Sequence, residues 1–214
     1  MNTKSRVKYY SHLEEKLNIW SHAVGLLLSV VALFFLLNKA AQQDQILYWV
    51  AYIVYCLSQI AVFSASTFYH AATDETRRHR LNIFDHSAIY LSIAGTYTPI
   101  TMLVIPGVWG WSVFLVVWSM ALVGIVLKLF FTGRFSLVST ISYVVMGGVI
   151  VLAIKSLLNL MALPGLLLLA LGGLIYVIGA VLYQLKQIPY NHAVFHFFVL
   201  AAAVCHFLMI YFFT

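Results

Sequence analysis

Charge is what this sequence most lacks. Only 8% of its 214 residues are charged, whereas 63% are hydrophobic. A soluble globular domain carries about 25% charged residues and about 45–50% apolar ones. So little charge cannot cover a water-exposed surface, and most of the chain must therefore face a lipid bilayer. The composition excludes a soluble domain and predicts an integral membrane protein.

Acidic residues and cysteines are also scarce. Six Asp and Glu stand against twelve Lys and Arg, which gives a net charge of +6. The basic residues lie in short links between apolar runs and form no single patch, so we predict no nucleic-acid binding. Cys56 and Cys205 both lie within apolar runs. This predicts two small buried side chains rather than a disulfide or a cysteine-rich metal motif.

Long apolar runs recur seven times along the chain. Each has about 20 residues or more, enough for a helix to cross about 30 Å of hydrocarbon. Backbone polar groups in lipid must be hydrogen-bonded internally, so these runs are expected to be helices. The sequence predicts an all-α, seven-transmembrane-helix bundle, a single domain of residues 1–214 with an N-terminal segment at 1–17. The predicted spans are Asn18–Leu37, Ile46–Tyr69, Ile83–Val104, Trp109–Phe131, Leu137–Leu157, Leu163–Tyr183 and His192–Phe213.

Lys and Arg are divided unevenly between the two ends of the predicted bundle. Ten lie in the N-terminal segment and in the second, fourth and sixth links, whereas only Lys39 and Lys155 lie at the other end. Basic links stay on the cytoplasmic side of a membrane. We therefore expect a cytoplasmic N-terminus and, with seven spans, an outside C-terminus. The expected location is the cell (inner) membrane, as a multi-pass protein.

A few polar and ionisable residues lie near the ends of these spans. Such residues are costly in a membrane and are functional candidates. The predicted topology places all of them in one layer near the cytoplasmic face. They are Glu15, Asn18 and His22 at the first span, Ser66 and His70 at the second, Asp85 at the third, and His192 and His196 at the seventh.

The spacing of the histidines favours a metal site in this layer. His192 and His196 are four residues apart, so they share one helical face and can chelate one ion. His70 is the best-placed third ligand. Three neutral histidines with one open position are typical of catalytic zinc. The sequence therefore predicts zinc as the cofactor, although imidazole also accepts other divalent metals.

Five further residues in the layer can support such a site. Asp85 can hydrogen-bond a metal-bound water or act as its general base. Ser66, one turn from His70 on the same face, can donate a hydrogen bond to a polarised oxygen. Glu15, Asn18 and His22 are candidates for the shell of hydrogen bonds around the ligands.

Plainer interpretations of these residues stay open at the level of sequence. The convergence of all of them in one layer favours the joint interpretation as a site. The alternatives are that His192 and His196 face lipid headgroups, that His70 lies in a loop, that Asp85 pairs with Arg80 or caps the third helix, that Glu15 and Asn18 are interfacial caps, and that Ser66 bonds its own i−4 carbonyl.

Polar residues also continue inward from this layer. Gln59 on the second span and Ser92 and Thr96 on the third predict either a cavity or direct hydrogen bonds between helices. Pro99 predicts a kink in the third helix. The remaining expectations are close helix packing at Gly147-Gly148 and Gly172-Gly173, a buried polar His206 near the opposite end, and different neighbours for Asp85 and His86.

At these residues the sequence resembles the progestin and adipoQ receptor family, and more closely its bacterial branch, the hemolysin III-like proteins. The resemblance covers essentially the whole chain. It implies a seven-helix bundle with a cytoplasmic N-terminus, zinc bound by His70, His192 and His196, and Asp85 touching the metal through water. The wider superfamily includes alkaline ceramidases, which hydrolyse a lipid amide. The motifs are Glu15-x-x-Asn18-x-x-x-His22, Ser66-x-x-x-His70 with Asp85, the run Phe84–Pro99, and Ile188-Pro-Tyr-Asn-His192 with His196.

Three functions are compatible with this sequence. The first is a zinc-dependent hydrolase of a lipid amide or ester, with membrane lipids and a lipid-like substrate as partners. The second is a non-enzymatic receptor or regulator of membrane state whose zinc is structural. The third, a pore-forming haemolysin, is disfavoured because the outer halves of the spans show little polarity beyond His206.

Overall fold

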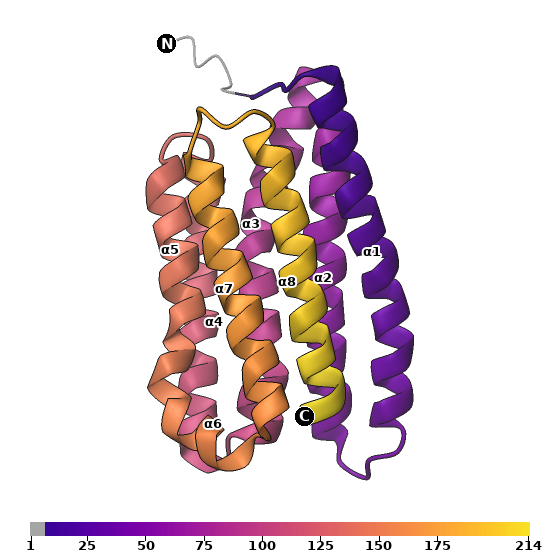
Figure 1. The fold of residues 1–214 in the computed structure, drawn as a ribbon, viewed down its shortest axis with the longest axis vertical. Helices are drawn as coiled ribbons and strands as arrows, with labels where there is room; N and C mark the ends of the chain where they lie inside the picture. The colour runs from indigo at the N-terminus through magenta and orange to yellow at the C-terminus, as the bar shows by residue number, and fades with distance from the viewer. Residues whose placement is uncertain (1–6) are drawn as a thin grey trace.

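The computed structural model describes residues 7–214 as helices that run side by side along one long axis (Figure 1). Within this part of the chain, seven helical segments are long and apolar enough to cross a membrane. The predicted seven-span all-α fold is therefore confirmed. The helices are α1 (His12–Ala40), α2 (Ile46–Ala71), α3 (Glu75–Pro99), α4 (Gly107–Phe131), α5 (Ser136–Gly148), α6 (Ile154–Leu160), α7 (Leu163–Gln184) and α8 (Asn191–Phe213).

The helices alternate in direction, so chemically related residues from distant segments meet at one end. We call this the N-terminal end of the bundle: α1, α3, α5 and α8 begin there, and α2, α4 and α7 end there (Figure 1). α8 ends at the opposite end. The most extensive contacts join α2 to α3, α7 to α8 and α1 to α2. α1, α2, α3 and α8 thereby supply the polar layer at the N-terminal end.

Two helices begin well before their predicted spans. α1 starts at His12, where the Ser11 hydroxyl caps it by accepting a hydrogen bond from the Glu14 backbone N–H at 3.3 Å. α3 starts after Asp74, whose carboxylate accepts from the Arg77 N–H at 2.7 Å. Hydropathy detects apolar runs and not capped polar turns, so the predicted spans omit the first turns of both helices. Residues 1–6, which include two of the basic residues counted above, lie outside the described residues.

Two spans change helix type along their length. α3 passes after Pro99 into a π-helical turn at Ile100–Val104, because proline has no N–H to continue the α-helical hydrogen bonds. The irregularity expected at Pro99 thus takes the form of a wider helical turn. The fifth span consists of α5, a 3₁₀ turn at Val149–Ala153, and α6.

The predicted close packing at the glycine pairs is wrong at three of four positions. A Cβ added at Gly147, Gly148 or Gly173 would meet no atom within 4 Å. Gly147 and Gly148 lie exposed on the outer surface of α5. Only Gly172 makes a close approach, against the imidazole of His206, which is buried as expected with Nε2 3.3 Å from the Leu169 carbonyl oxygen.

Direct hydrogen bonds account for the polar residues in the middle of the bundle. Gln59 Nε2 of α2 donates to the Thr96 hydroxyl at 3.2 Å and to the Ser92 carbonyl at 3.4 Å on α3. The Ser92 hydroxyl donates back to Gln59 Oε1 at 3.3 Å. These bonds favour the interpretation of the three polar residues as direct hydrogen bonding between packed helices rather than as the lining of a cavity. Cys56 is buried as predicted, but Cys205 is only partly buried.

Candidate metal centre

Three histidines meet at the N-terminal end of the bundle. His70 lies in the last turn of α2, and His192 and His196 lie in the first turns of α8; each is at least 93% buried. His192 Nε2 lies 3.1 Å from His70 Nε2 and 3.1 Å from His196 Nε2. Their ligand atoms lie within 4.8 Å of one another. His70 is therefore not in a loop, and His192 and His196 do not face lipid headgroups.

The start of α8 is set by the link that precedes it. Tyr190 adopts a left-handed backbone conformation, with φ 55°, which turns the chain back into the bundle. The Asn191 side chain then donates a 2.7 Å hydrogen bond to the Tyr183 carbonyl of α7. These two features place His192 and His196 on the face of α8 that looks inward.

The outer ring nitrogens determine which tautomers face the centre. His70 Nδ1 lies 2.7 Å from Glu15 Oε2, and a carboxylate only accepts, so this nitrogen carries the proton. His196 Nδ1 lies 3.3 Å from the Asn18 carbonyl oxygen and is likewise a donor. Both Nε2 atoms then turn lone pairs towards His192. A proton on His192 Nε2 could make a well-aligned hydrogen bond to only one of these two lone pairs. A cation bound between the three nitrogens would satisfy both, so the arrangement suits a metal ion.

The spacing of the three nitrogens fits a metal ion. Zinc binds imidazole nitrogen at about 2.0–2.1 Å, and a tetrahedral arrangement places neighbouring ligand atoms about 3.3 Å apart. The two separations of 3.1 Å are close to this value. The hydrogen bond from a ligand histidine to a carboxylate, as between His70 and Glu15, is the usual support for a metal-bound imidazole. The residues present can therefore hold a metal.

Glu15 is itself held by an arginine that the sequence analysis treated only as a topology signal. Arg78 is 98% buried, and its guanidinium forms an ion pair with Glu15 Oε1. It also donates to the carbonyl oxygens of His70 at 3.3 Å and Ala72 at 3.1 Å. Arg78 thus links α1, α2 and α3 behind the histidines. No pattern in the sequence distinguishes it from the exposed Arg77 and Arg80 beside it.

Asp85 and Ser66 are two further buried polar residues at the N-terminal end of the bundle. Within residues 7–214, Asp85 has no ion pair with Arg80, and Asp74 rather than Asp85 caps α3, so both plainer interpretations of Asp85 are wrong. Its carboxylate instead lies 3.7 Å from His86 Nδ1. The Ser66 hydroxyl is buried and has no hydrogen-bond partner among the described residues, so it bonds no carbonyl of its own helix.

Comparison with known proteins identifies the family. A family described as Haemolysin-III related matches residues 10–207 of this chain. The chain belongs to this family. The Hemolysin-3 homolog of Bacillus subtilis (strain 168) is 40% identical over 200 residues, 94% of each chain. Hemolysin-3 of Bacillus cereus is 37% identical over 201 residues, 94% of this chain and 92% of that protein.

A more distant relative extends the comparison to animals. The human Monocyte to macrophage differentiation factor is 29% identical over 206 residues, which cover 92% of this chain and 83% of that protein. The resemblance to the hemolysin III-like branch of the progestin and adipoQ receptor family is therefore confirmed.

In this haemolysin-III-related protein, two polar residues of α1 contact the ligand histidines. Asn18 is fully buried, and its backbone carbonyl oxygen lies 3.3 Å from His196 Nδ1, so it is not an interfacial cap. His22 stacks on His196, with ring centroids 3.8 Å apart and an interplanar angle of 16°. Neither ring nitrogen of His22 has a hydrogen-bond partner among the described residues.

The chain before α1 covers the histidines, which the sequence did not predict. We call Val7–Ser11 the N-terminal strap. The Tyr10 ring stacks on His192, with ring centroids 4.6 Å apart and an interplanar angle of 15°. The backbone N–H of Tyr10 donates a hydrogen bond to Glu15 Oε1 at 3.2 Å. The Lys8 carbonyl accepts from Arg78 Nη2 at 2.9 Å. Burial raises the pKa of Tyr10, so its phenol stays protonated.

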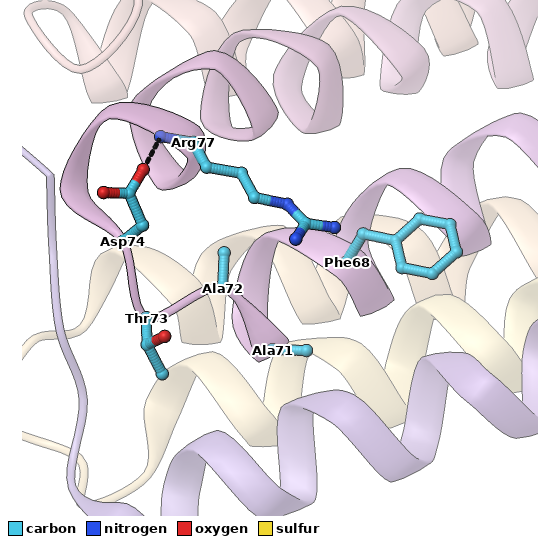
Figure 2. Close-up of a pocket in the computed structure, with 6 residues that line it drawn as sticks. All are labelled: Phe68, Ala71, Ala72, Thr73, Asp74 and Arg77. Carbon is cyan, nitrogen blue, oxygen red and sulfur yellow. Dashed lines mark hydrogen bonds between the residues drawn. The ribbon is translucent and has the colours of Figure 1, made fainter.

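A pocket lies at the same end of the bundle but outside the histidine cluster. It occupies about 290 Å³ at the turn between α2 and α3 (Figure 2). In this view the Arg77 side chain extends across the turn towards Phe68, and the Asp74 carboxylate caps the helix beside them. None of the three histidines lines this pocket.

Proposed function

We propose that this haemolysin-III-related protein binds zinc through His70, His192 and His196 and hydrolyses a lipid amide or ester at the cytoplasmic end of the bundle. The whole chain acts as one domain of the inner membrane, with its N-terminus in the cytoplasm. One observation carries the proposal: His192 Nε2 lies 3.1 Å from the Nε2 atoms of His70 and His196, all three rings are buried, and Glu15 and Asn18 direct two of the lone pairs inward.

The ligand set supports a transition metal such as zinc over magnesium or calcium. Imidazole nitrogens suit zinc, copper, iron and nickel, whereas magnesium and calcium prefer oxygen ligands. Three neutral histidines leave one coordination position open, as in catalytic zinc sites. Asp85 is not part of the histidine cluster, so it is assigned to the reaction rather than to metal binding.

The neighbouring residues have the chemistry that hydrolysis requires. When bound, zinc supplies Lewis acidity and lowers the pKa of water towards about 7. Asp85 takes a proton from the attacking water and returns it to the leaving nitrogen or oxygen. The Ser66 hydroxyl, which has no hydrogen-bond partner among residues 7–214, donates to the carbonyl oxygen as negative charge develops there. Glu15 and Asn18 hold the ligand tautomers throughout.

The alternative is a non-enzymatic receptor or regulator of membrane state with a structural zinc. Tyr10 favours it, because its ring stacks on His192 and the N-terminal strap covers the centre. The metal would then couple the positions of α1, α2 and α8 without turnover. A pore-forming haemolysin is the least supported function, because the central polar residues bond directly to one another.

Turnover and metal content measured together separate the first two functions. The purified chain is incubated with a panel of long-chain acyl amides and esters, and released fatty acid is quantified. Asp85→Asn is expected to lower turnover by about 100-fold or more while the zinc content is unchanged. Asp74→Asn is the matched control, because asparagine also caps a helix. Absence of hydrolysis by the wild type, or equal hydrolysis by Asp85→Asn, would reject the hydrolase.

A further inference from the structure

A groove runs between α3 and α4 on the outer surface, near the N-terminal end of the bundle. It occupies about 270 Å³, and its walls are apolar side chains that include Phe84 and Leu91 of α3 and Ile125 and Leu129 of α4. Phe84 is 48% exposed and Leu129 is 56% exposed. The groove is therefore open on its outer side, where a helical bundle in a membrane contacts lipid. Its apolar lining suits contact with a hydrocarbon chain.

A positive charge marks the polar end of this groove. Arg80 lines it, is exposed, and has no ion pair within residues 7–214. Arg77, three residues earlier on the same helix, extends towards Phe68 of α2 (Figure 2) and lies outside the groove lining. A guanidinium group binds phosphate oxygens through two parallel hydrogen bonds. The polar end of the groove thus has the charge and geometry to hold a phosphate.

An unpartnered hydroxyl lies further along the groove. Ser87 lines it, is 92% buried, and its Oγ has no hydrogen-bond partner in the described part of the chain. A serine in a membrane helix ordinarily bonds the carbonyl four residues earlier. Ser87 is seven residues after Arg80, two turns or about 10 Å deeper along the helix. Its free donor suits an acceptor that enters the groove, such as an ester carbonyl.

We propose that this groove binds one anionic phospholipid from the leaflet at the N-terminal end of the bundle. Arg80 holds the phosphate and Arg77 adds to the local positive charge. Ser87 donates to an ester carbonyl of the glycerol backbone, and one acyl chain lies between α3 and α4. A zwitterionic phospholipid shares the phosphate but carries a cation that the two arginines repel. The site is separate from the metal centre, because none of the three histidines lines the groove.

Competition between lipids tests this site directly. The full chain is purified in detergent and equilibrated with equimolar phosphatidylglycerol and phosphatidylcholine of identical acyl chains, and the bound lipids are counted by native mass spectrometry. The wild type is expected to retain one phosphatidylglycerol preferentially. Arg80→Gln lowers this preference about fivefold, since one basic residue near an anionic lipid surface contributes that much. Arg134→Gln, an exposed arginine in the α4–α5 link, leaves it unchanged.

Ser87→Ala separates the headgroup from the ester. Both lipids carry the ester carbonyl, so this variant is expected to weaken retention of both equally while their ratio is preserved. Thermal unfolding of each lipid-free variant checks that the fold is intact. An unchanged lipid ratio in Arg80→Gln would overturn the proposal. An equal fall in Arg134→Gln would also overturn it, because the preference would then reflect the general positive charge of this end.

Discussion

Glu15 connects the metal centre to the rest of the molecule through its two carboxylate oxygens. Oε2 accepts from His70 Nδ1, and Oε1 pairs with the buried Arg78 and accepts from the Tyr10 N–H. The first contact directs the His70 lone pair towards the other histidines. The ion pair with Arg78 keeps the carboxylate in this position, because its displacement would leave the buried Arg78 without an ion-pair partner. A single side chain thereby fixes both ligand orientation and helix position.

Glu15→Gln tests this role. Glutamine can still fill the space, but it loses the negative charge that holds the His70 N–H and Arg78. We expect zinc affinity to fall by about 10- to 100-fold, the usual cost of losing such a support. Competition with a zinc chelator measures it. Glu14→Gln is the control, because Glu14 lies in the same helical turn but forms no ion pair with any histidine within residues 7–214; equal affinities in the two variants would refute the role.

At the scale of the elements, α2 and α3 pack tightly against each other at Gly95. A Cβ there would meet Ser58 Cβ at 2.5 Å, whereas one at Gly147 would meet nothing. Gly95→Ala is therefore expected to destabilise the protein by about 1–3 kcal/mol through overpacking. Gly147→Ala is expected to stabilise it by up to about 1 kcal/mol, because alanine favours a helix. Unfolding of both variants in the same detergent measures the difference, and equal stabilities would contradict it.

The N-terminal strap is expected to slow the exchange of metal at the centre. Tyr10→Ala removes the ring that stacks on His192, so we expect zinc to leave about three- to tenfold faster, in line with the strength of one aromatic contact. Tyr10→Phe keeps the ring and is expected to match the wild type. Stopped-flow mixing with a coloured chelator gives the rate. Unchanged release from Tyr10→Ala would mean that the strap does not cover the route of the ion.

At the scale of the whole molecule, the basic residues predict the orientation in the membrane. Ten of twelve Lys and Arg lie in segments assigned to the N-terminal end. Green fluorescent protein fused before Met1 is therefore expected to fluoresce, and alkaline phosphatase fused after Thr214 is expected to be active outside the cytoplasm. An inactive phosphatase with fluorescence at both ends would mean an even number of crossings.

The sequence predicted the architecture well because lipid imposes a simple rule on it. Apolar length alone placed the second span at Ile46–Tyr69, and the helix runs Ile46–Ala71. The same rule missed the first turns of α3, where Arg78 is polar yet buried. Alternation of helix direction brought His70 and His196 to one end. It could not reveal Arg78 behind Glu15 or Tyr10 over His192, because those contacts depend on side-chain directions in three dimensions.

Metal content of the purified protein tests the central claim most directly. Elemental analysis after chelator-free purification with added metal is expected to find about one zinc per chain in the wild type, the stoichiometry of one three-histidine site. His70→Ala and His192→Ala are expected to lose it, whereas His12→Ala, at the exposed start of α1, is expected to retain it. Absence of zinc in the wild type, or equal zinc in all four proteins, would contradict the account and leave the histidines as a polar packing network.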